Sequence, residues 1–159
     1  LDYNPNQEVW LRVPQKSVKV SLYVGVVNEW LLDNKIEIDD TEVTCVNNEY
    51  GYAGKIDVTA TYKGEPGIID WKTTKTKPKD KAKDLPWDSH PQQIAAYSKA
   101  RFDKIPSWGC NVYLSTTEID PYPRLEAVWW DRETLEKNYD KFIKTFELWK
   151  CIKNYQPTH

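Results

Sequence analysis

Residues 54–72 read GKIDVTATYKGEPGIIDWK, and this stretch predicts the β-hairpin on which the rest of the fold depends. Between residues 55 and 62 apolar and polar residues alternate, which is typical of a strand with one buried face. The apolar set is Ile56, Val58, Ala60 and Tyr62. Lys63–Pro66 has the composition of a turn, and we expect a second short strand over residues 67–72.

The predicted hairpin brings three charged side chains to one face. A turn over residues 63–66 pairs Tyr62 with Gly67, Thr59 with Asp70 and Asp57 with Lys72. Because side chains alternate along a strand, Asp57, Asp70 and Lys72 would share a face, with opposite residues about 5 Å apart. A slip of one residue would move one strand's polar set to the other face. Two carboxylates and an ammonium at this separation suit a metal site with a neighbouring positive charge. The alternative is a solvated hairpin face on which the ion pairs occur by chance.

Length and charge narrow the class of protein. The 159 residues suit one domain, over residues 1–159, with a substantial core. The net charge of -2 does not by itself indicate a nucleic-acid-binding protein, but residues 72–83 hold six Lys and one Asp. No apolar run approaches the length of a membrane span, so we expect no membrane partner.

The three cysteines favour a reducing environment over a metal cluster. Cys45, Cys110 and Cys151 are widely spaced and form no CxxC motif, which argues against a zinc ribbon and against an iron–sulfur cluster. An odd count without a signal peptide favours an intracellular location, in a bacterial or phage-infected cytoplasm or an organelle. The chain starts at Leu1 and contains no Met, so we expect a preceding N-terminal segment that could contribute to the site.

The remaining periodicities predict an α/β fold with a mixed central sheet flanked by helices. The expected elements are an irregular segment over 1–15, a helix over 17–34 (or a strand over 18–24) with close packing at Gly25, a strand over 36–46, the hairpin, an unpacked polar loop over 73–88, a helix over 89–102 capped by Ser89, strands over 109–116 and 125–130, and a last helix capped by Asp131. The first three strands would form an antiparallel meander. The helix after residue 88 would be a crossover that makes the fourth strand parallel to the third.

Three motifs resemble those of the PD-(D/E)XK nuclease superfamily, in its RecB-like branch. They are Gly54–Asp57 (GxxD), Asp70–Lys72 (DxK) and Gln93–Tyr97 (QxxxY), in the family's order. Residues 47–97, about a third of the chain, look closest to the mitochondrial genome maintenance exonucleases and their phage or bacterial relatives. The resemblance implies a restriction-endonuclease-like fold and a DNA exonuclease or flap nuclease of DNA repair or recombination, using Mg²⁺ or Mn²⁺.

The resemblance also assigns roles to single residues. Asp57 and Asp70 match the metal-binding acids, the backbone carbonyl of Trp71 matches a further metal ligand, and Lys72 matches the catalytic lysine. Mg²⁺ commonly takes one or two carboxylates and keeps waters and phosphate oxygens, so the two acids suit it. Such an ion activates water and polarises a phosphoryl oxygen. A charged Lys72 could hydrogen-bond the attacking water or stabilise charge on the phosphoryl group.

Residues around this centre have implied roles as well. Gln93 and Tyr97 match the helix motif that orients the site and touches the substrate. Glu42 falls where such nucleases can place another acid, which holds the attacking water or a second ion. Asn28, in the segment Gly25–Asn28, stands where many RecB-like nucleases have a His ligand.

A lysine-rich run leaves the predicted site and could follow a phosphate backbone. The candidate substrate contacts are Thr73, Lys75, Lys77, Lys79 and Arg101, with Lys81 and Lys83 continuing the run. A solvated linker is the alternative interpretation. Trp87 could stack on an unpaired base or serve as a packing residue. We expect His90 simply to precede a helix-starting proline rather than to bind a metal.

Together these features predict a Mg²⁺- or Mn²⁺-dependent DNA exonuclease that acts on single strands, flaps or free ends. One alternative is a catalytically inactive DNA-binding module on the same fold. Another is a structure-specific endonuclease, because a fold does not determine a function. The Asp–Asp–Lys set argues against a pure binding module, which has no need of two acids facing a phosphate.

Overall fold

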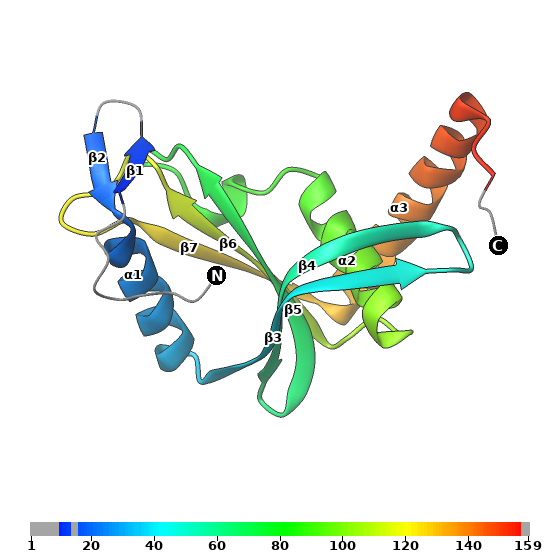
Figure 1. Ribbon diagram of the computed structural model, residues 1–159, viewed down its shortest axis with the longest axis horizontal. Helices are drawn as coiled ribbons and strands as arrows, with labels where there is room; N and C mark the ends of the chain where they lie inside the picture. The colour runs from blue at the N-terminus through cyan, green and yellow to red at the C-terminus, as the bar shows by residue number, and fades with distance from the viewer. Residues whose placement is uncertain (1–9, 14–15, 157–159) are drawn as a thin grey trace.

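A five-stranded mixed sheet forms the centre of the fold in the computed structural model, which describes residues 10–13 and 16–156 (Figure 1). Its strands, in spatial order, are β3 (Ile36–Asn47), β4 (Tyr52–Tyr62), β5 (Glu65–Thr74), β6 (Trp108–Ser115) and β7 (Leu125–Asp131). Only the β5–β6 pair is parallel. The predicted α/β class, the antiparallel meander and the crossover to a parallel fourth strand are therefore confirmed.

Helices cover both faces of the sheet and create two apolar cores. The helical elements are α1 (Val20–Asp33), η1 (Ala82–Asp84), α2 (Ser89–Phe102) and α3 (Arg132–Lys153). On one face, Leu31 of α1 packs with Val58, Ile69 and Val112. On the other face, α2 and α3 supply Ile94, Ala95 and Leu135, which pack with Ile56 and Ile68. The charged residues of the candidate site lie on this second face.

The turn of the β4–β5 hairpin is tighter than predicted. Lys63 and Gly64 both have positive φ, 52° and 79°, and Tyr62 pairs with Glu65 across a two-residue loop. Positive φ at both central positions is the signature of the hairpin turn that matches the twist of the flanking strands. The predicted pairing of Tyr62 with Gly67 is therefore wrong by two residues. A register shift of two residues does not by itself move a side chain to the other face, because side chains alternate with a period of two.

The predicted alternation along the hairpin fails at one place. The last pair between β4 and β5, counted from the hairpin turn, is Val58 with Ile69. Farther from the turn, β4 separates from β5 and remains paired with β3, alongside α2 and α3 (Figure 1). Val58 and Ala60 pack on the α1 face as predicted, whereas Ile56 joins the core beneath α2. Asp57 lies at this departure point.

The N-terminal expectations need correction. Trp10–Val13 is a strand, β1, paired with β2 (Lys16–Lys19), so the described part of the supposedly irregular segment is regular; the rest of residues 1–15 lies outside the described residues. The helix begins at Val20, so the alternative strand holds only for residues 18 and 19. Gly25 is exposed, and a Cβ there would meet nothing within 4 Å, so it does not mark close packing.

Helix ends and the polar loop show further differences. Asp131 caps α3 as predicted, accepting a hydrogen bond from the Thr134 backbone N–H. The residue before α2 is Asp88, which forms no side-chain cap, so Ser89 is the first helical residue and not the cap. The loop after β5 is not unpacked, because Thr76 is buried. All three cysteines are free, and among the described residues no helix has the length and apolar composition to cross a membrane.

Candidate active site

An ion pair within β5 is the centre of the candidate site. Asp70 and Lys72 are two residues apart on the strand and therefore share a face. The Lys72 Nζ lies 3.0 Å from Asp70 Oδ1 and 2.8 Å from Oδ2. Asp70 is only 3% exposed, so a partner that compensates its charge is required.

The α2 helix holds the lysine from the other side. Gln93 Oε1 accepts a hydrogen bond from Lys72 Nζ at 3.0 Å, and Gln93 Nε2 donates to the Tyr97 hydroxyl at 3.2 Å. The two residues are four positions apart and therefore neighbours on one helix face. The structure thus brings the predicted pair Gln93 and Tyr97 to the predicted Lys72.

The glycine of the first motif belongs to the same assembly. A Cβ on Gly54 would lie 2.2 Å from Cε1 of the Tyr97 ring, so only glycine leaves room for the ring there. Contacts therefore join the three sequence motifs: Gly54 accommodates Tyr97, Tyr97 accepts from Gln93, and Gln93 holds Lys72.

Asp57 joins the site at the point where β4 leaves β5. Its Oδ2 accepts a hydrogen bond of 2.9 Å from the Trp71 backbone N–H. Burial is the main cause that raises the pKa of Asp57 above its ordinary value of 3.8. The Trp71 hydrogen bond and the Lys72 charge lower this pKa, whereas the Asp70 charge raises it further. The charges of Asp70 and Lys72 thus reach Asp57, although the predicted pairing of Asp57 with Lys72 and of Thr59 with Asp70 is wrong, since Thr59 pairs with Ile68.

Sequence reasoning missed two residues that support Asp70. Asn111, fully buried on β6, pairs with Asp70 in the parallel register and donates from Nδ2 to Asp70 Oδ2 at 2.8 Å. Trp130 Nε1 in turn donates to Asn111 Oδ1 at 2.8 Å. The signal was a single amide side chain within an otherwise apolar strand, since a buried polar group needs partners.

His90 also lies closer to the site than predicted. Its Nδ1 is 2.7 Å from the Tyr113 hydroxyl, and Tyr113 is the β6 partner of Lys72. Burial lowers the pKa of His90, the Lys72 charge lowers it further, and the Asp70 charge raises it. The ring is therefore within electrostatic range of the ion pair, although it was expected to be only a residue at the helix start.

Two predicted site residues lie outside the hydrogen-bond network. On β3, Glu42 lies between Thr41 and Val43, which pair with the two neighbours of Asp57 on β4. The charge of Glu42 raises the pKa of Asp57. However, Glu42 is exposed, has a positive φ of 57°, and forms an ion pair with Lys55. Arg101 is exposed on the last turn of α2, near Cys45, one turn beyond Tyr97.

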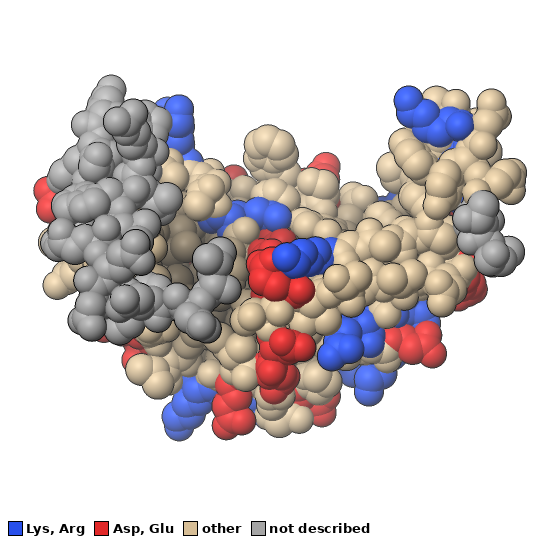
Figure 2. Space-filling view, in the orientation of Figure 1, with Lys and Arg blue, Asp and Glu red and all other residues tan. Residues whose placement is uncertain are grey.

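The lysine-rich loop is exposed at its side chains and fixed at its backbone. Thr73, Lys75, Lys77 and Lys79 are all exposed. Figure 2 shows acidic and basic side chains next to each other in the middle of one face, rather than a broad area of positive charge. Any attraction for an anion therefore depends on local placement of lysines and not on net charge.

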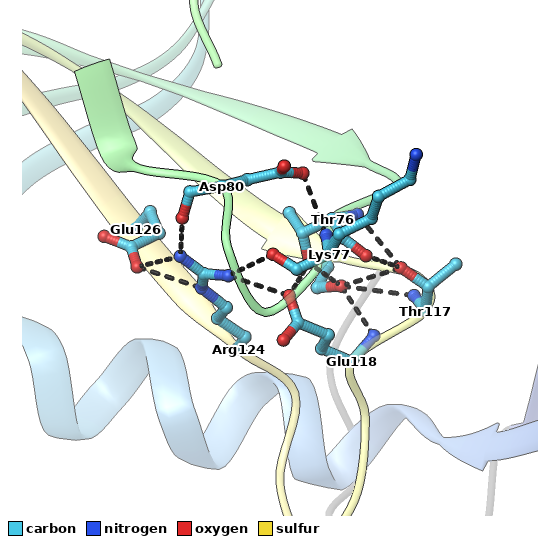
Figure 3. Close-up of polar contacts among 8 residues, drawn as sticks. Thr76, Lys77, Asp80, Thr117, Glu118, Arg124 and Glu126 are labelled. Atoms are coloured by element: carbon cyan, nitrogen blue, oxygen red, sulfur yellow. Dashed lines mark hydrogen bonds and ion pairs between the residues drawn. The ribbon is translucent and has the colours of Figure 1, made fainter. Parts of the chain in front are cut away.

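Arg124 is the residue that fixes this loop (Figure 3). Its guanidinium donates to the backbone carbonyls of Lys77 at 3.0 Å and Asp80 at 2.6 Å, and it also pairs with Glu118 and Glu126. The buried Thr76 hydroxyl bonds Ser115 and Glu118, while its N–H donates to Thr117 Oγ1. The backbone carbonyls of Lys77 and Asp80 thus point toward Arg124. The lysine side chains of the loop therefore extend from a backbone with a fixed conformation.

A cleft of about 480 Å³ opens beside the site between β4, α2 and α3. Gln93 and Tyr97 form part of its wall. The other lining residues are Tyr52, Ala53, Ser89, Gln92, Ala96, Phe142 and Phe146. The site is therefore next to a mixed polar and aromatic cleft of the size in which small ligands bind.

The oxygen donors of the site suit a hard divalent cation. Asp57, Asp70 and the Trp71 carbonyl offer two carboxylates and one carbonyl, and Mg²⁺ completes such a set with waters. Within residues 10–13 and 16–156 no group of three or more His, Cys, Asp or Glu side chains is placed to hold a metal.

Comparisons with known proteins do not assign a family. No protein-family model matches the chain, and no curated protein matches it. A crystal structure of a protein named SSO0001 is similar over 79% of this chain, at 18% identity and a TM-score of 0.39. The similarity covers 58% of that chain, so the present chain spans less than two thirds of it. At this TM-score the similarity carries no argument about function.

Proposed function

We propose that this protein is a Mg²⁺- or Mn²⁺-dependent deoxyribonuclease that hydrolyses phosphodiester bonds at DNA ends, single strands or flaps. The observation that carries the proposal is the Lys72 ammonium held between Asp70 and Gln93, with Asp57 next to them. An ammonium in a charge-compensated site is suited to stabilise an anionic reacting group. Two acids on adjacent strands offer carboxylate oxygens, the ligands that Mg²⁺ prefers.

Asp57, Asp70 and the Trp71 carbonyl would hold the cation. When bound, it would activate water and neutralise charge on the phosphate. Asn111 fixes the orientation of Asp70 through a hydrogen bond of 2.8 Å, and Trp71 does the same for Asp57 at 2.9 Å. Positioned acids of this kind make a site more effective because less reorganisation is needed on binding.

Lys72 would contact the reacting group itself. Its ammonium has three N–H donors, and both carboxylate oxygens of Asp70 lie within reach of it. If a bound cation shared the charge of Asp70, one N–H of Lys72 would be available for a phosphoryl oxygen or the attacking water. Gln93 would still hold the ammonium, because its hydrogen bond does not involve Asp70.

The surroundings support a polyanionic substrate that extends beyond one phosphate. The exposed lysines of residues 75–83 follow directly after β5, which carries Asp70 and Lys72. Each lysine at a phosphate would add a salt-sensitive contribution to binding. The finer alternatives, an inactive DNA-binding module and a structure-specific endonuclease, predict different outcomes in the test below.

The test is cleavage of labelled linear single-stranded, linear duplex and closed circular DNA with Mg²⁺, Mn²⁺ or EDTA. We expect metal-dependent loss of the linear single strand and survival of the closed circle. Asp70→Asn and Lys72→Ala should each lower the rate by about 100-fold or more, a typical cost for one charge-stabilising group. Lys63→Ala removes an exposed lysine in the hairpin turn and should leave the rate unchanged.

Each other outcome changes the assignment in a defined way. Cleavage that persists undiminished in Asp70→Asn would show that this site is not the catalytic one. Cutting of the closed circle would identify an endonuclease. Salt-sensitive DNA binding without cleavage at any metal concentration would favour the inactive binding module.

A further inference from the structure

The most exposed aromatic side chain among the described residues stands beside the candidate site. Trp87 is 74% exposed and precedes α2 by two positions. Indole is usually covered by other groups, because leaving so large an apolar surface in water is unfavourable. An exposed Trp near a candidate site is therefore a candidate contact for a ligand.

The Trp87 ring is exposed but lies alongside another ring. It is parallel to the His90 imidazole, with an interplanar angle of 6° and ring centroids 6.0 Å apart. The backbone that carries it is hydrogen-bonded: the Trp87 backbone N–H donates to His90 Nδ1 at 3.3 Å, and the His90 backbone N–H donates to the Trp87 carbonyl at 2.9 Å. A ring carried on a fixed backbone loses less conformational freedom when a ligand stacks on it, which favours binding.

The pair is anchored to the strand next to the ion pair. His90 Nδ1 lies 2.7 Å from the Tyr113 hydroxyl, and Tyr113 is the β6 partner of Lys72. Burial and the Lys72 charge lower the pKa of His90, and the Asp70 charge raises it, so the charges of the ion pair reach the imidazole. Trp87 thus belongs to the same side of the molecule as the candidate site, in contact with a residue that the site's charges reach.

We propose that Trp87, supported by His90, stacks on an unpaired base of the DNA strand whose phosphate is held at Asp70 and Lys72. This inference rests on the proposed function and specifies its substrate. Bases are the flat groups that adjoin every phosphate in DNA, and stacking on aromatic side chains tolerates any base sequence. In a duplex the base faces are already covered by neighbouring pairs, so Trp87 favours single strands and frayed ends.

The test measures the affinity of the full chain for labelled oligonucleotides with Ca²⁺ in place of Mg²⁺. Stacking of one base typically accounts for between about fivefold and 150-fold in affinity. Trp87→Ala should therefore weaken single-strand binding within that range, while Trp87→Phe should retain most of it. Binding of a closed circular duplex, which has neither unpaired bases nor ends, should not change. Tyr122→Ala, which removes another exposed aromatic ring, is the matched control.

An abasic site moved along the oligonucleotide identifies the base. The wild-type protein should lose affinity at one position, and Trp87→Ala should lose nothing further there, because the two changes remove the same contact. Additive losses, or equal losses on single and paired DNA, would overturn the stacking assignment. Cleavage that continues in such a case would leave the proposed function intact. Absence of both binding and cleavage in the wild-type protein would refute the proposed function itself.

Discussion

Gly54→Ala is the substitution that best tests how the three motifs depend on one another. The added Cβ would lie 2.2, 2.8 and 3.0 Å from three atoms of the Tyr97 ring. No polar group is removed, and the strand itself accepts alanine. Any effect must therefore pass through the displaced ring.

The size of the effect follows from the contact distances. The ring has to move from 2.2 Å to the 3.4 Å at which ordinary van der Waals contact begins, a shift of about 1.2 Å. Overpacking of this kind typically costs about 1–3 kcal/mol of unfolding free energy. The shift also lengthens the 3.2 Å hydrogen bond from Gln93 to Tyr97, which releases Gln93 and loosens Lys72. A misplacement of about 1 Å can lower a catalytic rate by about 100-fold.

The assay combines urea unfolding with cleavage of a single-stranded oligonucleotide. Gly67→Ala is the matched control: its Cβ would lie 2.3 Å from the Trp108 ring, on the opposite face of the sheet. We expect both variants to lose stability and only Gly54→Ala to lose its rate per folded molecule. Gly25→Ala, at an open helix position, should gain up to about 1 kcal/mol.

A double-mutant cycle provides the refuting result. In a Tyr97→Ala background the ring is absent, so Gly54→Ala should cost less than about 0.5 kcal/mol. The coupling between the two positions should then be at least about 0.5 kcal/mol. Additive losses of stability would show that the glycine has another role. A Gly54→Ala protein that cleaves DNA at the wild-type rate would refute the link from Tyr97 through Gln93 to Lys72.

Two further predictions concern the acids and the loop. Burial raises the pKa of Asp57 in the folded chain above its ordinary value of 3.8. As pH rises, the unfolded chain therefore loses this proton before the folded chain does. Stability falls between pH 3.8 and the folded pKa. Asp57→Asn should therefore raise Tm at pH 7, and the difference in Tm between the variant and the wild type should shrink at lower pH. Any gain in Tm that the wild-type protein shows on adding Mg²⁺ should disappear in the variant. A lower Tm of the variant at pH 7 would contradict this reasoning. Arg124→Ala should lower the free energy of unfolding by about 1.5–3 kcal/mol, because charged hydrogen bonds are lost. It should also speed amide hydrogen exchange over residues 75–80. Arg124→Lys keeps the charge but not the forked geometry, so it should restore only part of the lost stability. Unchanged exchange in both variants would exclude Arg124 as the residue that fixes the loop.

Periodicity and turn composition predicted the elements well because those signals are local. The strand over residues 36–46, the helix over 89–102 and the Asp131 cap all follow from patterns within a few residues. The hairpin register was less accessible, since Lys63-Gly64 and the four-residue turn Lys63–Pro66 both fit the composition. Only the positive φ of both Lys63 and Gly64 decides between them.

The candidate site was predictable where it depends on local order and unpredictable where it depends on pairing. Asp70 and Lys72 share a face in any strand, so their contact follows from spacing alone. Asn111 is 41 residues from Asp70 along the chain, and only the parallel register of β5 and β6 places it there. Trp130 and His90 reach the site through the same tertiary pairing.

The departure of β4 from β5 is what makes room for a second acid. In a continued ladder the Trp71 N–H would face the backbone of β4, whereas here it donates to the Asp57 carboxylate. This geometry places a half-buried acid near Asp70, and burial raises the pKa of Asp57, which disfavours its charged form. Proteins commonly retain such destabilising groups where function requires them. A module that only binds DNA gains nothing from two acids close together, because both repel phosphate. The arrangement therefore agrees better with the proposed nuclease than with a module that only binds DNA.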